Sequence, residues 1–200
     1  MHQEADVSAG SRMPARVAVW PGLAAAAVLV LTVFQLRHQG RSWWCSCGYG
    51  WPWAGDVWTL HNSQHLADPY SFTHVLHGLV LCGALAWVGA RLPWLWRFFL
   101  AVSFEAAWEM FENTEFVIQR YREATLALGY TGDTIANSMG DIAFCGIGFM
   151  IARYLGFWRS VVFFLLTDCV LLLWIHDSLV LNVVMLIWPI DAIKAWQMGH

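Results

Sequence analysis

Long apolar stretches alternate with polar connections along most of this chain. Five of them have roughly the 20 residues that a helix needs to cross the hydrocarbon core of a bilayer. They cover residues 17–36, 72–90, 94–113, 133–152 and 160–176. A further apolar stretch, residues 178–188, is too short to cross and stops at Pro189, so it predicts a helix at the membrane interface. The pattern predicts an all-α polytopic integral membrane bundle of about five transmembrane helices plus a C-terminal interfacial helix.

Composition supports one membrane domain. Residues 1–14 are polar and predict a short N-terminal tail, and residues 15–200 predict a single membrane domain. The chain is 58% hydrophobic and 12% charged, whereas about 25% of residues are charged in a soluble domain. Its 14 tryptophans suit membrane–water interfaces. The net charge of −3 gives no reason to propose nucleic acid as a partner.

The orientation in the membrane depends on lysine and arginine in the connections. With a cytoplasmic N-terminus, the inner segments hold six of the 11 residues of these types and the outer segments hold five, so the counts alone do not decide. The two short inner connections carry Arg91 and Arg153, which favours a cytoplasmic N-terminus.

Three of the predicted spans carry polar residues at helical spacing, and all three polar stripes lie at the same end of the bundle. Ionisable groups at membrane depth are costly, so such stripes must face the bundle interior or a wet cavity. With spans of alternating direction, the stripes meet in one layer near the outer face. The stripes are His74 and His77; Glu105, Glu109 and Glu112; and Asp133, Asn137 and Asp141.

Several chemistries fit this polar cluster. Its five carboxylates cannot all be charged side by side, so some must be protonated, paired or bound to a cation. His74, Glu109 and Asp133 could hold a divalent metal, because imidazole and carboxylate are both good ligands. A His–carboxylate pair could instead act as general acid and base on a lipid headgroup. Recognition of a polar or cationic headgroup, and a purely structural hydrogen-bond network between helices, are the other readings. Whether the protein is an enzyme stays open.

Polar residues in the connections extend the possible site. Arg120 and Arg122 could contact a phosphate as substrate-binding residues, or anchor the chain at the interface. His61 and His65 could cover the cluster as a lid, or be solvated loop residues. The C-x-C pair formed by Cys45 and Cys47 could help to bind a metal, with loop packing as the alternative.

Several segments of the chain resemble a known family. They are WWCSCG, NSQHLADPYSFTHVLHG, EAAWEMFEN, RYREATLALGYTGDTIANSMGD and LVLNVVMLIWPIDAIKAWQ. They resemble uncharacterised protein family 0314, a group of bacterial inner-membrane proteins, over nearly all of the chain after residue 40. The resemblance implies a multi-pass protein of a Gram-negative inner membrane and supplies no activity.

A fainter similarity is to the VanZ-like family, which is associated with teicoplanin resistance. That family shows a His on an early helix, a Glu-rich helix, a basic residue and then D-x-x-x-N. Here the order is His74, the glutamates from Glu105 to Glu112, Arg122, and then Asp133 and Asn137. The VanZ-like pattern often has Gln where this chain has Glu112. The similarity implies a role on an envelope lipid or the cell wall.

These observations predict an inner-membrane protein that binds, and in one alternative processes, the headgroup of an envelope lipid. Membrane lipid is then the expected partner. The alternative is a non-enzymatic accessory subunit of a larger membrane complex, which would suit the tryptophan-rich loop at residues 37–71.

Overall fold

The computed structural model describes residues 15–124 and 129–199, so the predicted polar tail at residues 1–14 lies outside the described residues. The described chain is helical apart from its loops and one isolated β-bridge, which confirms the all-α prediction. Its long helices are α1 (Ala15–His38), α2 (Ser71–Val88), α3 (Trp94–Glu112), α5 (Ile135–Leu155) and α6 (Phe157–Ile175). The short helices are α4 (Glu115–Ala124), α7 (Leu179–Ile187) and α8 (Asp191–Gln197).

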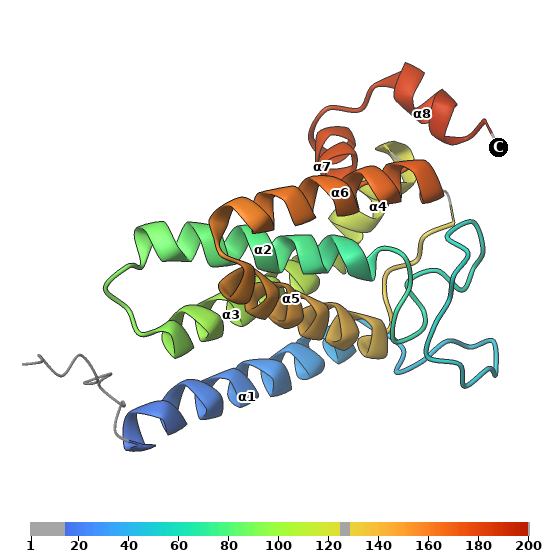
Figure 1. The fold of residues 1–200 in the computed structure, drawn as a ribbon. Coiled ribbons are helices and arrows are strands. Elements are labelled where there is room, and N and C mark those ends of the chain that lie inside the picture. Colours follow the sequence, from blue (N-terminus) through green and yellow to red (C-terminus); the bar gives the residue numbers. More distant parts are fainter. Residues whose placement is uncertain (1–14, 125–128, 200) are drawn as a thin grey trace, which may run out of the picture.

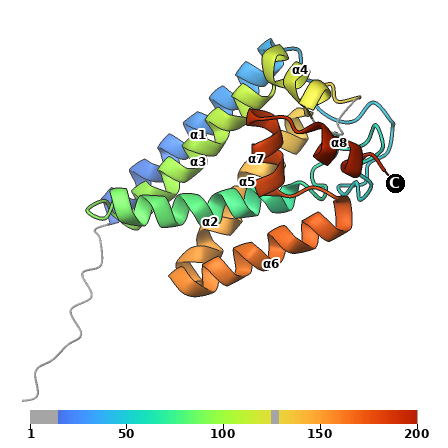
Figure 2. The same ribbon diagram turned by 90° about the horizontal axis from the view of Figure 1, so that it is seen from above.

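Four of the long helices, α1, α2, α5 and α6, are long and apolar enough to cross a membrane. The helix α3 has a similar length and packs beside α1 and α5 in the same bundle (Figures 1 and 2). It carries Arg97 and three glutamates, which set it apart from the other four. Glu105 and Glu109 are buried inside the bundle, so these two carboxylates do not face the outside. The arrangement therefore agrees with the predicted bundle of about five spans.

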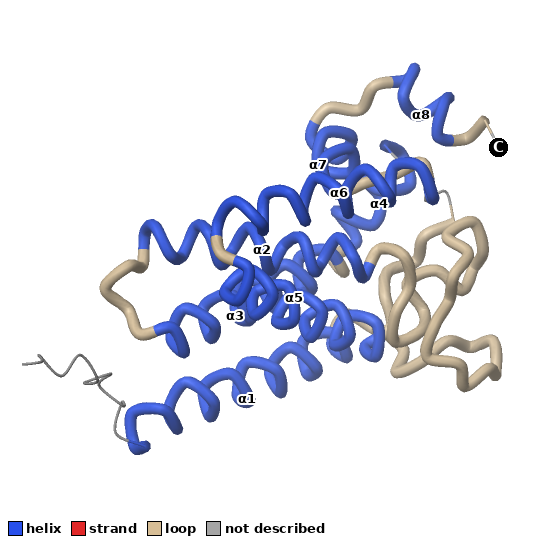
Figure 3. The backbone as a smooth tube through the Cα atoms, in the orientation of Figure 1, coloured by secondary structure: helices blue, strands red, loops and turns tan. Residues whose placement is uncertain are grey.

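The connections divide the bundle into two different ends (Figure 3). The long loop at residues 39–70 lies at one end, near the short helices α4, α7 and α8 (Figure 1). The tight turn at residues 89–93 and the single residue Gly156 make the connections at the other end. The short helix predicted at 178–188 is observed as α7, and its place at the interface stays a prediction, whereas α8, which follows Pro189, was not predicted.

The closest helix pair is α2 with α5, and two glycines make it possible. A Cβ atom on Gly78 of α2 would collide with the backbone carbonyl oxygen of Cys145. In the same way, a Cβ atom on Gly148 of α5 would collide with the carbonyl oxygen of Val75. Small residues allow this backbone contact between membrane helices. The contact brings the polar ends of α2 and α5 together.

The long loop is attached to the first turn of α5. The amides of Ile135 and Ala136 donate to the carbonyl oxygens of Ser42 (2.8 Å) and Trp43 (3.2 Å). The Thr134 amide donates to the carbonyl oxygen of Ser63 (3.1 Å), and the Thr134 hydroxyl accepts from the Asn137 amide (3.2 Å) as an N-cap. These bonds satisfy helix-terminal donors that have no partner within the helix. The loop consequently covers the end of the bundle that carries the polar stripes.

Candidate functional site

The three predicted stripes meet between α2, α3 and α5. His74 Nδ1 lies 2.5 Å from Glu105 Oε1 and 3.5 Å from Glu109 Oε1. On its other side, His74 Nε2 lies 3.8 Å from Asp141 Oδ2. His77 Nδ1 lies 2.9 Å from the same oxygen of Glu105. The structure thus brings residues from three helices into one polar cluster.

Glu109 is a fully buried carboxylate of the cluster that lies near His74 Nδ1 but outside hydrogen-bond geometry. It is 0% exposed, and neither of its oxygens has a hydrogen-bond partner among the residues that the structure describes. The Nδ2 atom of Asn137 is in the same condition, in a side chain that is 1% exposed. A buried polar group without a partner costs about 1–3 kcal/mol, and more when it is charged. The Glu109 oxygens therefore call for a proton, an ordered water or a cation beside them, whereas Asn137 Nδ2 calls for an acceptor such as an ordered water.

Asp133 is held in a separate hydrogen-bond network towards the loops. It accepts from Asn113 Nδ2 (2.9 Å) and from the Tyr130 hydroxyl (2.8 Å), and its own amide donates to Asn113 Oδ1 (2.7 Å). Burial raises the pKa of Asp133 to about 6, although the hydrogen bonds from Tyr130 and Asn113 act in the lowering direction. Asn113 closes α3 and was not predicted as a site residue.

A cavity of about 80 Å³ lies against the cluster. It has room for several water molecules, since one needs about 10–15 Å³ by this measure. Its lining includes five of the eight predicted residues, namely His74, His77, Glu112, Asp133 and Asp141. Glu105, Glu109 and Asn137 are not part of that lining. The sequence-predicted cluster therefore has a layer at the cavity and a layer behind it.

The cavity also has polar lining residues that the sequence analysis missed. They are Asn62, Ser63, Tyr70, Thr73, Tyr121, Tyr130 and Asn182. Burial raises the pKa of all three tyrosines, and nearby carboxylates raise it further. Their hydroxyls consequently stay protonated and can donate; the Tyr70 hydroxyl donates to Asp177 Oδ2 (3.1 Å). Burial also raises the pKa of Asp177 to about 6.

The two arginines that were predicted as phosphate contacts donate to backbone carbonyl groups in the structure. Arg120 Nε donates to the carbonyl oxygen of Leu186 (2.8 Å), and its Nη2 donates to that of Ile187 (3.1 Å). A cation there suits the C-terminal end of α7. Arg122 Nε donates to the carbonyl oxygen of Tyr130 (2.5 Å). Neither arginine lines the cavity, so both support its wall through α7 and Tyr130.

The cluster offers two sets of ligand atoms to a metal ion. One is His74, His77 and Glu105, and the other is His74, Glu109 and Glu112, with the atoms of each set within 4.8 Å of one another. Asp133, which the sequence analysis grouped with His74 and Glu109, belongs to neither set. The oxygens of Asp133 accept hydrogen bonds from Asn113 and Tyr130 and are not grouped with the His74 ligand atoms. The arrangement can hold a cation or keep protons on closely spaced carboxylates.

The comparisons with known proteins agree with the sequence resemblance. A family described as "Protein of unknown function (DUF2585)" matches residues 36–199. A UPF0314 protein of Rhizobium meliloti (strain 1021) is 42% identical over 195 residues, covering 96% of this chain and 98% of its own. This chain belongs to the UPF0314 family. Another member, from Agrobacterium fabrum (strain C58 / ATCC 33970), is 45% identical over 179 residues and 89% of each chain.

Membership of UPF0314 confirms the family that the five quoted segments predicted. A third UPF0314 protein, from Paracoccus denitrificans (strain Pd 1222), is 41% identical over 170 residues, which cover 85% of this chain and 88% of its own. No solved structure matches the chain. The similarity to the VanZ-like family stays a prediction.

Proposed function

We propose that this UPF0314 protein is a multi-pass protein of the bacterial inner membrane that binds an amine-bearing headgroup of an envelope lipid. The N-terminus would be cytoplasmic and the polar cavity would lie near the outer face. One observation carries the proposal: the described cavity lining presents three carboxylates, Glu112, Asp133 and Asp141, against the two imidazoles of His74 and His77, and contains neither lysine nor arginine. Such a lining attracts hydrogen-bond donors and positive charge.

The mixture of polar and apolar side chains in the cavity lining also suits a lipid. Beside the carboxylates and tyrosines, the lining includes the apolar side chains of Leu179, Val183 and Leu186 on α7. An amphipathic ligand with a polar head and an acyl tail would match the two kinds of surface. The sequence resemblance to inner-membrane proteins supports a location in that membrane. The cavity lies at one end of the helices, which is where lipid headgroups lie.

Lipid binding provides the first test. Purified protein in detergent should bind phosphatidylethanolamine in preference to phosphatidylglycerol, measured by native mass spectrometry. Glu112→Gln should weaken ethanolamine-lipid binding by roughly tenfold or more, because a charge-assisted hydrogen bond is worth about 1.5–3 kcal/mol. Glu115→Gln is the matched control, because Glu115 is exposed on α4 outside the cavity lining.

Equal binding of both lipids, or unchanged binding by Glu112→Gln, would contradict an amine-selective cavity. Absence of lipid binding together with stable association with another membrane subunit would favour the accessory-subunit alternative.

A second candidate function, processing of the headgroup, is favoured by His77. This side chain lines the cavity and its Nδ1 contacts the buried Glu105, at 2.9 Å from Oε1 and 3.2 Å from Oε2. A carboxylate in that position orients an imidazole for proton transfer from its other nitrogen. His77 would then be the acid–base group and Glu105 its positioning residue.

Turnover of envelope lipid would separate processing from binding. If His77 transfers a proton, wild-type protein should convert the bound lipid, and His77→Gln should slow conversion by about 100-fold or more. His38→Gln serves as the control because His38 is exposed at the end of α1. The assay follows the release of headgroup by mass spectrometry. Conversion at the wild-type rate by His77→Gln would exclude this role.

A further inference from the structure

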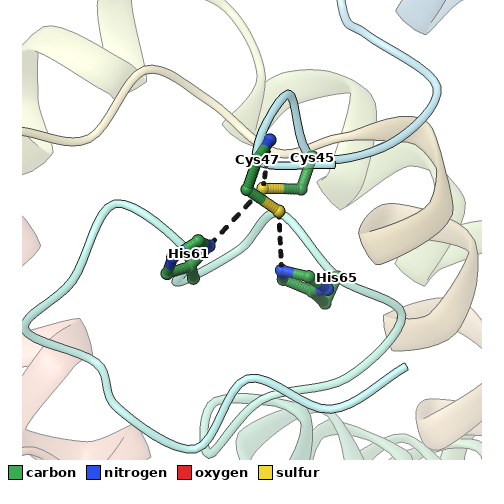
Figure 4. A group of neighbouring side chains, drawn as sticks. All are labelled: Cys45, Cys47, His61 and His65. Carbon is green, nitrogen blue, oxygen red and sulfur yellow. Dashed lines mark hydrogen bonds between the residues drawn. The ribbon is translucent and has the colours of Figure 1, made fainter. Parts of the chain in front are cut away.

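The loop between α1 and α2 brings two cysteines and two histidines together (Figure 4). Cys45 Sγ lies 3.6 Å from His61 Nδ1, and Cys47 Sγ lies 3.6 Å from His65 Nε2. One ligand atom from each of the four residues lies within 4.8 Å of the others. The cysteines and the histidines lie in separate parts of the sequence, whereas the fold joins them in one group.

The distances in this group match a tetrahedral metal site. Zinc binds thiolate sulfur at about 2.3 Å and imidazole nitrogen at about 2.0–2.1 Å. In a tetrahedron these bond lengths separate sulfur from nitrogen by about 3.6 Å. Both of the S–N distances, 3.6 Å, have that value. Two thiolates with two imidazoles favour zinc over magnesium or calcium, which prefer oxygen ligands.

The hydrogen bonds around the group prepare its atoms for a metal. His65 Nδ1 lies 2.6 Å from the carbonyl oxygen of Trp51. A carbonyl only accepts, so Nδ1 carries a hydrogen and the neutral ring directs the lone pair of Nε2 at Cys47. A metal-bound histidine is usually fixed by a backbone carbonyl in this way. The Cys47 amide also donates to Cys45 Sγ (3.2 Å), which stabilises negative charge on the sulfur.

Aromatic contacts hold the two imidazoles in place. The Trp44 ring meets the His65 ring edge to face, with centroids 5.6 Å apart, and Tyr49 lies 6.0 Å from His61. His65 is 3% exposed and Cys45 is 9% exposed, so these two members of the group are shielded from solvent. Cys47 and His61 are half-buried. A partly buried set of good ligands in a long loop without regular secondary structure is typical of a structural metal site.

We propose that Cys45, Cys47, His61 and His65 form a structural zinc site that fixes the loop over the cavity. All four tetrahedral positions are taken by protein, which leaves no place for a substrate. Asn62 and Ser63 lie between the two histidines in the sequence, and both of these residues line the cavity. The carbonyl oxygen of Ser63 also accepts from Thr134 at the start of α5. Zinc would thereby hold one wall of the cavity against α5.

Metal analysis of the purified full-length protein tests this site. Protein extracted in mild detergent without chelators should contain about one zinc per chain, measured by inductively coupled plasma mass spectrometry. Cys45→Ser and His65→Asn should each lose most of that zinc. Cys169→Ser, which replaces an exposed free cysteine on α6, should keep it. Glu112→Gln should also keep it, because this proposal does not depend on lipid binding.

Cobalt substitution keeps the proposal testable where a variant fails to fold. Wild-type protein loaded with Co²⁺ should show the strong visible bands of a tetrahedral ion and a thiolate-to-cobalt charge-transfer band. The charge-transfer band requires cysteine ligands, which the carboxylate-rich groups in the bundle do not supply.

Two results would overturn the site. One is wild-type protein without zinc that gives no thiolate-to-cobalt band. The other is folded Cys45→Ser and His65→Asn protein that keeps the metal of the wild type, since the ion would then lie elsewhere.

Discussion

Replacing Gly148 by alanine is expected to lower the free energy of unfolding by roughly 3 kcal/mol or more, because the new Cβ would overlap the backbone of Val75. Backbone atoms cannot move aside as a flexible side chain would, so α2 and α5 must separate. Gly78→Ala should have a similar effect, since its Cβ would meet the carbonyl oxygen of Cys145. At about 2–4 °C per kcal/mol for a domain of this size, melting in detergent should fall by about 6–12 °C.

The control for these two variants is Gly83→Ala on α2. A Cβ atom at Gly83 would have nothing within 4 Å, so alanine there should be neutral or stabilise the helix by up to about 1 kcal/mol. Melting curves followed by circular dichroism compare all three variants. If Gly83→Ala destabilised the protein as much as Gly148→Ala, the close helix contact would not be the cause.

His74→Leu is the second change with a large expected effect. It would remove the imidazole that contacts the buried carboxylates of Glu105, Glu109 and Asp141. Removing one partner from a buried ionic contact costs about 3–5 kcal/mol, because the remaining charges lose their compensation. The free energy of unfolding, measured by titration with sodium dodecyl sulfate in mixed micelles, should fall by about that amount.

A double variant separates the charge effect from a packing effect. Adding Glu109→Gln to His74→Leu removes a carboxylate that contacts His74 and has no hydrogen-bond partner of its own among the described residues, so about 1 kcal/mol or more of the loss should return. Loss of packing around the imidazole would not be recovered by that change. A cost below about 1 kcal/mol for His74→Leu alone would show that the carboxylates do not depend on His74.

The sequence was sufficient to predict the bundle because lipid imposes a strong pattern on spanning helices. Lengths near 20 apolar residues place α1, α2, α5 and α6 directly. The helix α3 was also predicted, although it carries three glutamates, because those glutamates repeat on one helical face. The short helix α8 follows a proline and has no long apolar pattern, so the sequence did not reveal it.

Much of the polar cluster was predictable for the same reason. Residues of one stripe share a face of their own helix, and lipid excludes that face, so the stripes of α2, α3 and α5 converge. Loop residues follow no such period. Nothing in the spacing of Cys45 and Cys47 indicates that His61 and His65 return to them, and Tyr130 gives no sign that it donates to Asp133. The roles of Arg120 and Arg122 depend on the carbonyl groups of α7 and Tyr130, which only the folded chain places.

The attachment of the long loop to α5 has a consequence for the ligands that this end of the bundle accepts. The exposed start of a helix is normally attractive to phosphate, through free amides and the positive end of the helix dipole. Here the amides of Ile135, Ala136 and Asn137 already donate to Ser42, Trp43 and Thr134. The first turn of α5 therefore has little capacity left for an anion. Selection of a lipid at this end would consequently depend on what its headgroup donates and not on its phosphate.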